Sequence, residues 1–354
     1  MRRPTRYDGV GRFSACMHQD LVKSRRKIPK WLMPLSGYAL SAASLVWVFR
    51  GFNFQQTLAD LESLDWRYVL IAVVFDLAVY LSHAWRWNIL LRPVARPSFW
   101  RSVQAIYIGL YANEILPLRT GELIRCYLLA HWNDLPISLA LSSAAIERIL
   151  DGIWLVVAMF ITTRLVPLPG YLVDGTRALS LGLCFLFALL IFVAIHKQKA
   201  HAVVSESRWA SGLRHVVEGI HAMGNWRTLL ATAGASLVYL GLQIVPVWAL
   251  MEGYGLDLSI WAAAAVFIIL RLGTAIPNAP GNAGLYQFFC VVGLGLFNVP
   301  KSTAVGFSLM MFSVLTLPLL IGGFVAVALT GLKLQDIRSR AHTSMRSTVG
   351  VASD

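Results

Sequence analysis

Ten charged residues of this 354-residue sequence lie inside apolar segments, where a charge is costly. On insertion scales each would cost about 2.5–3.5 kcal/mol at the centre of a membrane helix. Such residues therefore pair with one another, face water or bind a charged ligand. The ten are Arg86, Arg119, Arg125, Arg148, Arg271, Asp76, Glu114, Glu122, Glu147 and Asp151.

The densest group is Glu147, Arg148 and Asp151, inside the apolar run 136–163. Spacings of three and four residues place all three side chains on one sector of a helix. Glu147 lies about 17 Å into that helix at 1.5 Å per residue. Two interpretations stay open: a buried ion-pair network that holds helices together, and a path for an ion or a lipid headgroup.

Two other apolar regions are each interrupted by proline and glycine, which end helices. The first interruption separates run 103–117 from run 120–131. A helix that starts near Thr120 at mid-membrane presents free N–H groups, and Arg119 adds a full positive charge. We predict a phosphate site here. The alternative is that Glu122 and Arg125 simply pair with each other. Its candidate residues are Asn113, Glu114, Arg119, Thr120, Gly121, Glu122 and Arg125.

The second interruption separates run 260–276 from run 284–298. Its second arm would also begin with a positive helix end at depth, and Arg271 lies one or two turns before it. Two such ends directed at one point would suit an anionic headgroup. The alternative is a break that serves packing alone. The candidate residues are Arg271, Asn278, Gly281, Asn282 and Gly284.

The elements that must position these residues are membrane helices. The sequence is 57% hydrophobic and 14% charged, with a mean hydropathy of +0.62, whereas soluble domains carry roughly 25% charged residues. About 20 apolar residues cross a bilayer. We therefore predict an all-α polytopic membrane protein with about six spanning helices. The predicted spans are 31–49, 66–91, 136–163, 176–195, 228–250 and 303–331.

The distribution of Lys and Arg sets the predicted orientation. Residues 1–30 hold nine cations and two acids, which accounts for over half of the net charge of +13. The segments that we place inside hold 21 Lys and Arg, and those placed outside hold five. Basic residues concentrate on the cytoplasmic side of membrane proteins. The charge thus indicates topology rather than nucleic-acid binding, and predicts a multi-pass protein of the cytoplasmic (inner) membrane with both termini in the cytoplasm.

The order span, broken pair, span occurs twice, and the charge rule gives the two units opposite orientations. The arms of each pair are short for a core of ~30 Å, so we predict two re-entrant helical hairpins in an inverted repeat. Tilted short spans are the alternative. The predicted division is a basic cytoplasmic tail (1–30), a transmembrane domain (31–331) and a disordered cytoplasmic tail (332–354).

The sequence lacks the common signatures of enzymes and cofactor sites. The sequence contains no GxSxG, HExxH, P-loop or GxGxxG opening a helix, and its four cysteines are far apart. We therefore expect no enzyme, cofactor or metal. We expect Arg86 to snorkel to the cytoplasmic face. We assign four tryptophans to the interfaces and four glycines to helix packing. These are Trp85, Trp87, Trp100 and Trp132, and Gly109, Gly121, Gly293 and Gly295.

Three motifs in this order resemble the lysylphosphatidylglycerol synthase transmembrane (flippase) family, the membrane part of the multiple peptide resistance factor. The segment from Asn113 to Glu122 followed by Arg125 is similar to N-x-x-x-P-x-R-x-G-E-x-x-R of that family. Residues 147–151 are similar to E-R-x-x-D, and 276–284 are similar to I-P-x-x-P-G-G-x-G. With the helix pattern, the resemblance covers about residues 31–331.

The resemblance implies a helical bundle with re-entrant segments that moves a lipid between leaflets. Two positions depart from the family pattern: Asn282 stands where a glycine is frequent, and Gln287 stands where a glutamate is frequent. Gln287 cannot titrate. No soluble aminoacyl-transfer domain follows the last span in this sequence, so we expect no lysyl transfer.

These observations together predict a translocator of an anionic phospholipid or prenyl-phosphate lipid. The arginines would neutralise the headgroup, and Glu122, Glu147 and Asp151 would balance them when the site is empty. Two other functions stay open: an accessory membrane subunit of an envelope glycosyltransferase or lipid-modifying enzyme, and an intramembrane transferase with Glu147 or Asp151 as base. The identity of the lipid and the oligomeric state are left open.

Overall fold

The structure, a computed structural model, describes residues 32–116, 120–166, 221–275 and 279–331, together with 170, 174–175, 181–182, 339 and 343. Every element with described bounds is a helix, as the apolar composition predicts. In chain order the helices are α2 (Leu32–Phe49), α3 (Phe54–Glu62), α4 (Trp66–Leu91), α5 (Phe99–Ile115), α6 (Gly121–Trp132), α7 (Ile137–Leu165), α11 (Trp226–Gly253), α12 (Ile260–Thr274), η2 (Pro280–Asn282), α13 (Leu285–Gly295) and α14 (Lys301–Ala328).

Within the described residues, three helices are long and apolar enough to cross a membrane. They are α4, α11 and α14, with 26, 28 and 28 residues. At 1.5 Å per residue each extends about 40 Å, more than the ~30 Å of a bilayer core. Helix α7 has 29 residues, but its charged cluster lowers its apolar character. The prediction of an all-helical membrane protein is thus confirmed at this level.

The predicted apolar runs coincide with the observed helices within a few residues. Helix α3 is an addition, since we predicted only a loop between the first two spans. Its N-cap is Asn53, whose side-chain Oδ1 accepts a hydrogen bond from the Gln56 amide at 3.2 Å. The predicted span 176–195 and both predicted tails lie outside the described residues.

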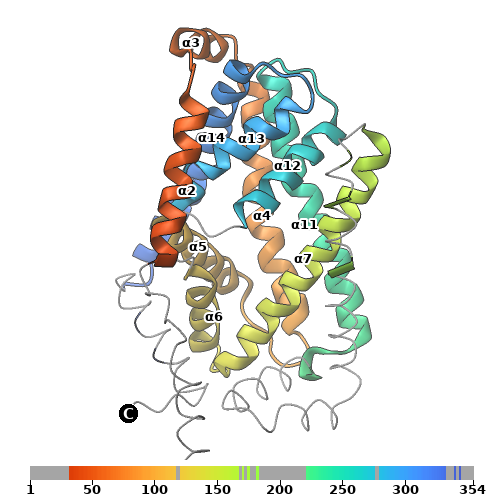
Figure 1. Ribbon diagram of the computed structural model, residues 1–354. Helices are drawn as coiled ribbons and strands as arrows, with labels where there is room; N and C mark the ends of the chain where they lie inside the picture. The colour runs from red at the N-terminus through yellow and green to blue at the C-terminus, as the bar shows by residue number, and fades with distance from the viewer. Residues whose placement is uncertain are drawn as a thin grey trace, which may run out of the picture.

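Helices α4 and α11 pack along each other, and the two broken pairs lie at different levels beside them. Figure 1 shows α5 and α6 in the lower part of the view and α12 and α13 in the upper part. Each pair packs side by side, and η2 contacts α5, so the two interruptions meet. This meeting point is where the candidate residues of both breaks come together.

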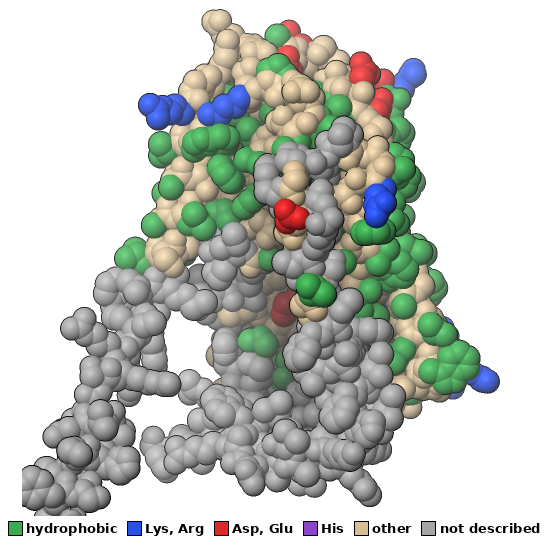
Figure 2. Space-filling view, turned by 45° about the vertical axis from the view of Figure 1, so that its right-hand side comes forward, with side chains coloured by type: hydrophobic (Ala, Val, Ile, Leu, Met, Phe, Trp, Pro, Cys, Tyr) green, Lys and Arg blue, Asp and Glu red, His purple; other side chains and the backbone are tan. Residues whose placement is uncertain are grey.

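Large apolar side chains on the outside of the bundle suit contact with lipid. One face of α4 exposes Trp66, Leu70, Val74, Leu81 and Trp85. Spacings of three to four residues, or multiples of them, align these side chains along the helix. Figure 2 shows hydrophobic side chains over the flanks of the molecule and charged side chains mainly near its upper end. An apolar surface of this kind would be unfavourable in contact with water, whereas it is expected where a membrane protein contacts lipid.

A close contact between glycines joins the two helices of the first broken pair. A Cβ added to Gly121 would lie 1.8 Å from the carbonyl oxygen of Gly109, so only glycine fits at this crossing of α5 and α6. The predicted packing role is therefore seen at these two positions. Gly293 makes ordinary contacts with Val266, and nothing lies within 4 Å of a Cβ at Gly295, so the prediction for Gly295 is wrong.

We expect Gly121→Ala to lower the free energy of unfolding by about 1–3 kcal/mol, because backbone atoms must separate to admit the methyl group. Denaturant titration in detergent micelles measures this change. Gly234→Ala on α11 is the matched control, since nothing lies within 4 Å of its added Cβ. That variant should be neutral or gain up to about 1 kcal/mol from helix propensity. Equal effects of the two substitutions would contradict the close packing of α5 against α6.

Candidate functional site

A closed ring of ion pairs lies between α4, α6 and α7. Three arginines and three acids alternate around it, so that each charge has an opposite charge on both sides. In order the members are Arg86, Glu147, Arg125, Glu122, Arg148 and Asp151, which returns to Arg86. With all six ionised the ring is neutral.

One half of the ring is buried. The side chain of Glu147 is 1% exposed and accepts hydrogen bonds from Arg86 Nε at 3.2 Å and from Arg125 Nη1 at 3.0 Å. The His83 ring lies beside them, with Nε2 at 3.6 Å from Glu147 Oε2 and 3.4 Å from Arg125 Nη1. This carboxylate therefore holds α4 and α6 against α7 in the interior of the bundle.

The other half of the ring is open. Glu122 accepts from Arg125 Nε at 2.8 Å and also pairs with Arg148. The Arg148 side chain is 53% exposed, and its Nη1 lies 3.8 Å from Asp151 Oδ2. Asp151 in turn pairs with Arg86. Arg148 is thus the arginine of the ring that is best placed to meet a ligand.

Aromatic faces support the two buried arginines. The Arg125 guanidinium lies 4.6 Å from the centre of the Trp87 ring, and Arg86 lies 4.4 Å from the centre of Tyr239. Trp87 is fully buried and donates through Nε1 to Ser143 Oγ at 2.8 Å. Two predictions are therefore wrong: Arg86 does not snorkel, and Trp87 is not an interfacial anchor. Both face inward because the tertiary fold supplies their partners.

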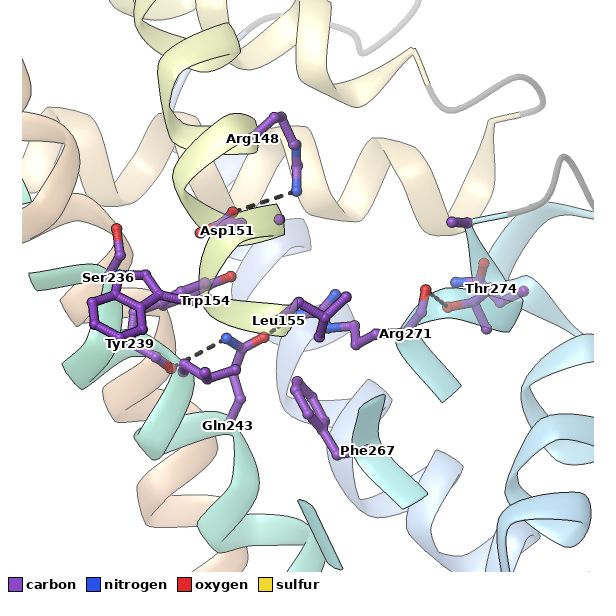
Figure 3. Close-up of a pocket in the computed structure, with 14 residues that line it drawn as sticks. Arg148, Asp151, Trp154, Leu155, Ser236, Tyr239, Gln243, Phe267, Arg271 and Thr274 are labelled. Atoms are coloured by element: carbon purple, nitrogen blue, oxygen red, sulfur yellow. Dashed lines mark hydrogen bonds and ion pairs between the residues drawn. The ribbon is translucent and has the colours of Figure 1, made fainter. Parts of the chain in front are cut away.

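A cavity of about 340 Å³ adjoins the open half of the ring. Figure 3 shows Arg148 and Asp151 on one side of it and Arg271 with Phe267 across from them. Helices α7, α11, α12 and η2 contribute the walls. The lining contains both polar and apolar side chains. Its other lining residues include Gly152, Trp154, Leu155, Ser236, Tyr239, Leu240, Gln243, Thr274, Ala275 and Asn282.

Arg271 faces the cavity without a carboxylate partner. Its guanidinium donates to Gln243 Oε1 and lies 5.3 Å from the centre of the Phe267 ring. In the part of the chain that the structure describes, no acid lies within ion-pair distance of it. With Arg148 on the opposite wall and Asp151 as the acid of the lining, the cavity carries an excess of positive charge.

The two interruptions meet beside this cavity. A Cβ at Gly281 would lie 3.1 Å from Glu114 Oε2, so the second break contacts the end of α5. The amide of Gly121 donates to Asn113 Oδ1 at 2.8 Å. This N–H group is therefore occupied by the protein itself, contrary to the predicted role of a free donor for phosphate. The Thr120 hydroxyl is buried, and it has no hydrogen-bond partner among the residues that the structure describes.

The second interruption has a backbone that suits its unusual residues. Gly281 and Asn282 both have positive φ, +68° and +55°, and asparagine tolerates this region better than most residues. The departure at Asn282 is thus compatible with the turn. Gln287 accepts from the Gly284 amide at 2.9 Å, so this side chain caps the start of α13. Gly284 packs on α2, where its added Cβ would lie 2.4 Å from the carbonyl oxygen of Ser41.

The structure thus places the predicted residues in two groups. The ring unites Glu122, Arg125, Glu147, Arg148 and Asp151. The cavity and the meeting point of the breaks contain Arg271, Asn282, Glu114, Gly281, Asn113, Thr120 and Gly121, and Gly284 lies against α2 instead. Arg119 and Asn278 lie outside the described residues.

Several site residues were missed by the sequence-based prediction. Arg86 carried a signal, because it is a charge within an apolar run. Tyr239, Gln243 and Ser236 on α11 had no sequence signal beyond polarity at spacings of three and four residues. As to metals, no group of three or more His, Cys, Asp or Glu in the described ranges could hold an ion.

Comparisons with known proteins identify relatives of this chain among membrane proteins. The sequence matches the profile of the lysylphosphatidylglycerol synthase TM region over residues 35–323. It is 22% identical to UPF0104 membrane protein MJ1595 of Methanocaldococcus jannaschii over 270 residues, 69% of this chain and 79% of that protein. Two UPF0104 membrane proteins of Methanothermobacter thermautotrophicus are 23% and 22% identical, over 69% and 67% of this chain and 80% and 75% of their own lengths. The chain therefore belongs to the lysylphosphatidylglycerol synthase transmembrane region family.

Proposed function

We propose that this protein moves an anionic or phosphate-bearing lipid between the leaflets of the cytoplasmic membrane and does not convert it chemically. The observation that carries the proposal is the cavity between Arg148 and Arg271, which has more positive than negative side chains. A bare phosphate in hydrocarbon is strongly unfavourable, and two arginines that flank a polar cavity would offset that cost. The lipid tails would remain in the membrane.

The proposed architecture has six spans and two re-entrant hairpins in an inverted repeat. Helices α5, α6, α12 and α13 have 17, 12, 15 and 11 residues. They are therefore about 26, 18, 23 and 17 Å long, short for a core of ~30 Å. The contact between Gly281 and Glu114 supports an arrangement in which the two hairpins meet at depth. Broken helices that meet near the midplane are typical of transporters.

The ring supplies a way to bind and release a headgroup without a net change of charge in the protein. In the empty state Arg148 is neutralised by Glu122 and Asp151. A phosphate that enters the cavity would compete with these carboxylates for the exposed guanidinium. Glu122 would still be paired with Arg125, and Asp151 with Arg86, so neither acid would be left alone. Replacement of the carboxylates by the phosphate at Arg148 would therefore change the free energy only a little, and transport requires a headgroup that is bound and released in this way.

The proposal predicts that Arg148→Ala slows transport at least tenfold while the protein stays folded. The measurement is dithionite quenching of fluorescent phosphatidylglycerol in proteoliposomes, where inner-leaflet dye becomes accessible only after crossing. A tenfold change corresponds to about 1.4 kcal/mol, close to the lower end of the roughly 1.5–3 kcal/mol that a hydrogen bond to a charged group contributes. Arg67→Ala is the matched control, because Arg67 is an exposed arginine at the start of α4.

Three outcomes separate the candidate functions. The first outcome is that liposomes with the wild-type protein show no more quenching than empty liposomes. If this holds for phosphatidylglycerol and for a panel of prenyl-phosphate lipids, it would contradict transport and favour an accessory subunit. A new lipid species in mass spectra of the same liposomes would favour a transferase. Wild-type activity that Arg148→Ala and Arg67→Ala leave equally intact would support transport by a route outside the cavity.

A further inference from the structure

One positive charge on the wall of the cavity has no acid as its partner. Among the described residues, the charged side chains of the lining are Arg148, Asp151 and Arg271. Arg148 and Asp151 belong to the ion-pair ring, where each of them has two partners of opposite charge. The ring is neutral as a whole, so it adds no net charge to the cavity. Arg271 is therefore the source of the excess positive charge.

The side chain that holds Arg271 is Gln243 of α11. Its Oε1 accepts a hydrogen bond from Arg271 Nη2, and its Nε2 donates to the backbone carbonyl oxygen of Tyr239 at 3.1 Å. Figure 3 shows the amide between these two partners, at the edge of the cavity. Gln243 is only 9% exposed, so water competes little for either contact. The amide is thus held with its oxygen toward the guanidinium.

The two partners of Gln243 permit only this orientation of its amide. A reversed amide would place its NH₂ group against the guanidinium and its oxygen against the carbonyl oxygen of Tyr239, so a donor would face a donor and an acceptor would face an acceptor. The amide is neutral, so it orients Arg271 without neutralising it. Arginine has five N–H donors, and the bond to Gln243 leaves others for the oxygens of a ligand.

A glutamate at position 243 would have nearly the same size as glutamine and the opposite effect on Arg271. Its carboxylate would form a charge-assisted pair with the guanidinium. The second carboxylate oxygen could not keep the contact with the Tyr239 carbonyl, because both atoms are acceptors. Both oxygens would therefore turn to Arg271. The cavity would then contain as many acids as arginines, and its excess of positive charge would be lost.

We propose that residue 243 determines the charge selectivity of the cavity: a glutamine there keeps Arg271 available for an anionic headgroup. The proposal rests on the function proposed above and adds to it a residue that sets specificity through another side chain. The alternative is that Gln243 only joins α11 to α12. In that case the size and hydrogen bonding of residue 243 would affect the protein, and its charge would not affect the choice of lipid.

The first test measures binding and does not require transport. Isothermal titration calorimetry in a non-ionic detergent gives the dissociation constants of dihexanoyl phosphatidylglycerol, which is anionic, and dihexanoyl phosphatidylcholine, which is zwitterionic. Wild type should bind the anionic lipid about tenfold more tightly, the lower end of the effect of one hydrogen bond to a charged group. Gln243→Glu should bind the two lipids equally. Gln55→Glu, the same change at an exposed position of α3, should keep the preference of wild type.

Gln243→Leu separates the charge of residue 243 from its structural contacts. Leucine removes both hydrogen bonds and adds no charge, so Arg271 stays uncompensated. We expect the preference for phosphatidylglycerol to remain within about threefold of wild type, because the electrostatic complementarity of the cavity is unchanged. Thermal unfolding of each variant in the same detergent reports the structural effect separately. A purely structural role would make Gln243→Leu at least as harmful to selectivity as Gln243→Glu.

Three results of the binding test would overturn the proposal. They are an unchanged preference in Gln243→Glu, a loss of preference in Gln243→Leu as complete as in Gln243→Glu, and equal binding of the two lipids by wild type. Arg271→Gln removes the same positive charge without adding an acid, so it must also abolish the preference. If Gln243→Glu did not fold, retention of the preference in Arg271→Gln would still overturn the proposal.

The flux assay distinguishes failure of this proposal from failure of the proposed function. Transport of both fluorescent lipids by wild type, with the same ratio of rates in Gln243→Glu, would overturn the role of residue 243 and leave transport intact. Binding selectivity that depends on residue 243, in a protein without flux, would overturn transport and support the role of Gln243. A ratio of rates that shifts toward phosphatidylcholine in Gln243→Glu, and not in Gln55→Glu, is the result expected.

Discussion

Replacement of Glu147 by alanine is expected to lower the free energy of unfolding by about 3–5 kcal/mol, the range seen when one partner of a buried ion pair is removed. Two arginines lose their shared acceptor: Arg86 Nε at 3.2 Å and Arg125 Nη1 at 3.0 Å. Both side chains are at most 2% exposed, so water cannot replace the carboxylate. Denaturant titration in detergent micelles measures the loss.

The matched control for Glu147 is Glu62→Ala, which removes an exposed acid at the end of α3. Its effect should remain within about 0.5 kcal/mol. Glu147→Gln keeps the shape of the side chain and one acceptor, so it should fall between the two. If Glu147→Ala proved as stable as Glu62→Ala, the ring would not be a structural element, and the closed circuit of ion pairs would need another explanation.

Much of the helical framework follows from one-dimensional information. Apolar length and the positions of Pro and Gly predict α4, α11 and the two broken pairs within a few residues, because a bilayer fixes the length of a span and proline ends a helix. Helix α3 could not be predicted in this way. It is short and mixed in polarity, and it depends on a local cap at Asn53.

The candidate site was predictable by residue type but not by partner. Charges in apolar runs indicated Arg125, Glu147 and Arg148, since each must be compensated. The sequence could not show that Arg86, 61 residues before Glu147, closes the ring. It also could not show that Asn113 occupies the Gly121 amide, because that contact depends on the packing of α5 against α6.

The ion-pair ring and the cavity have different roles. The buried half of the ring, centred on Glu147, fixes α4, α6 and α7, and the open half presents Arg148 to the cavity. Arg271 belongs to α12 of the second broken pair, and among the described residues it is held by an amide rather than by an acid. An amide leaves the positive charge uncompensated. For an anion in the cavity, Arg271 is therefore the stronger electrostatic partner, although Arg148 is the more exposed.

This asymmetry leads to the largest effect expected on transport. We expect Arg271→Glu to slow translocation of fluorescent phosphatidylglycerol about 100-fold, since reversal of the charge replaces attraction by repulsion. At an effective dielectric constant of about 20, one unit charge at 4 Å contributes about 4 kcal/mol. The cavity is partly open, so a net change of about 3 kcal/mol, or about 100-fold, is a reasonable expectation.

Arg227→Glu is the charge-matched control for this substitution. Arg227 lies at the start of α11, where its guanidinium stacks on Trp226 outside the cavity. The control should retain flux within about threefold, because surface charges act weakly through salt. Fluorescent phosphatidylcholine adds a second comparison: its headgroup is zwitterionic, so any flux of it should depend less on residue 271. Equal losses for Arg271→Glu and Arg227→Glu would show that overall charge, rather than the cavity, governs transport. A loss confined to Arg271→Glu and to the anionic lipid would instead assign recognition of the phosphate to the wall formed by α12.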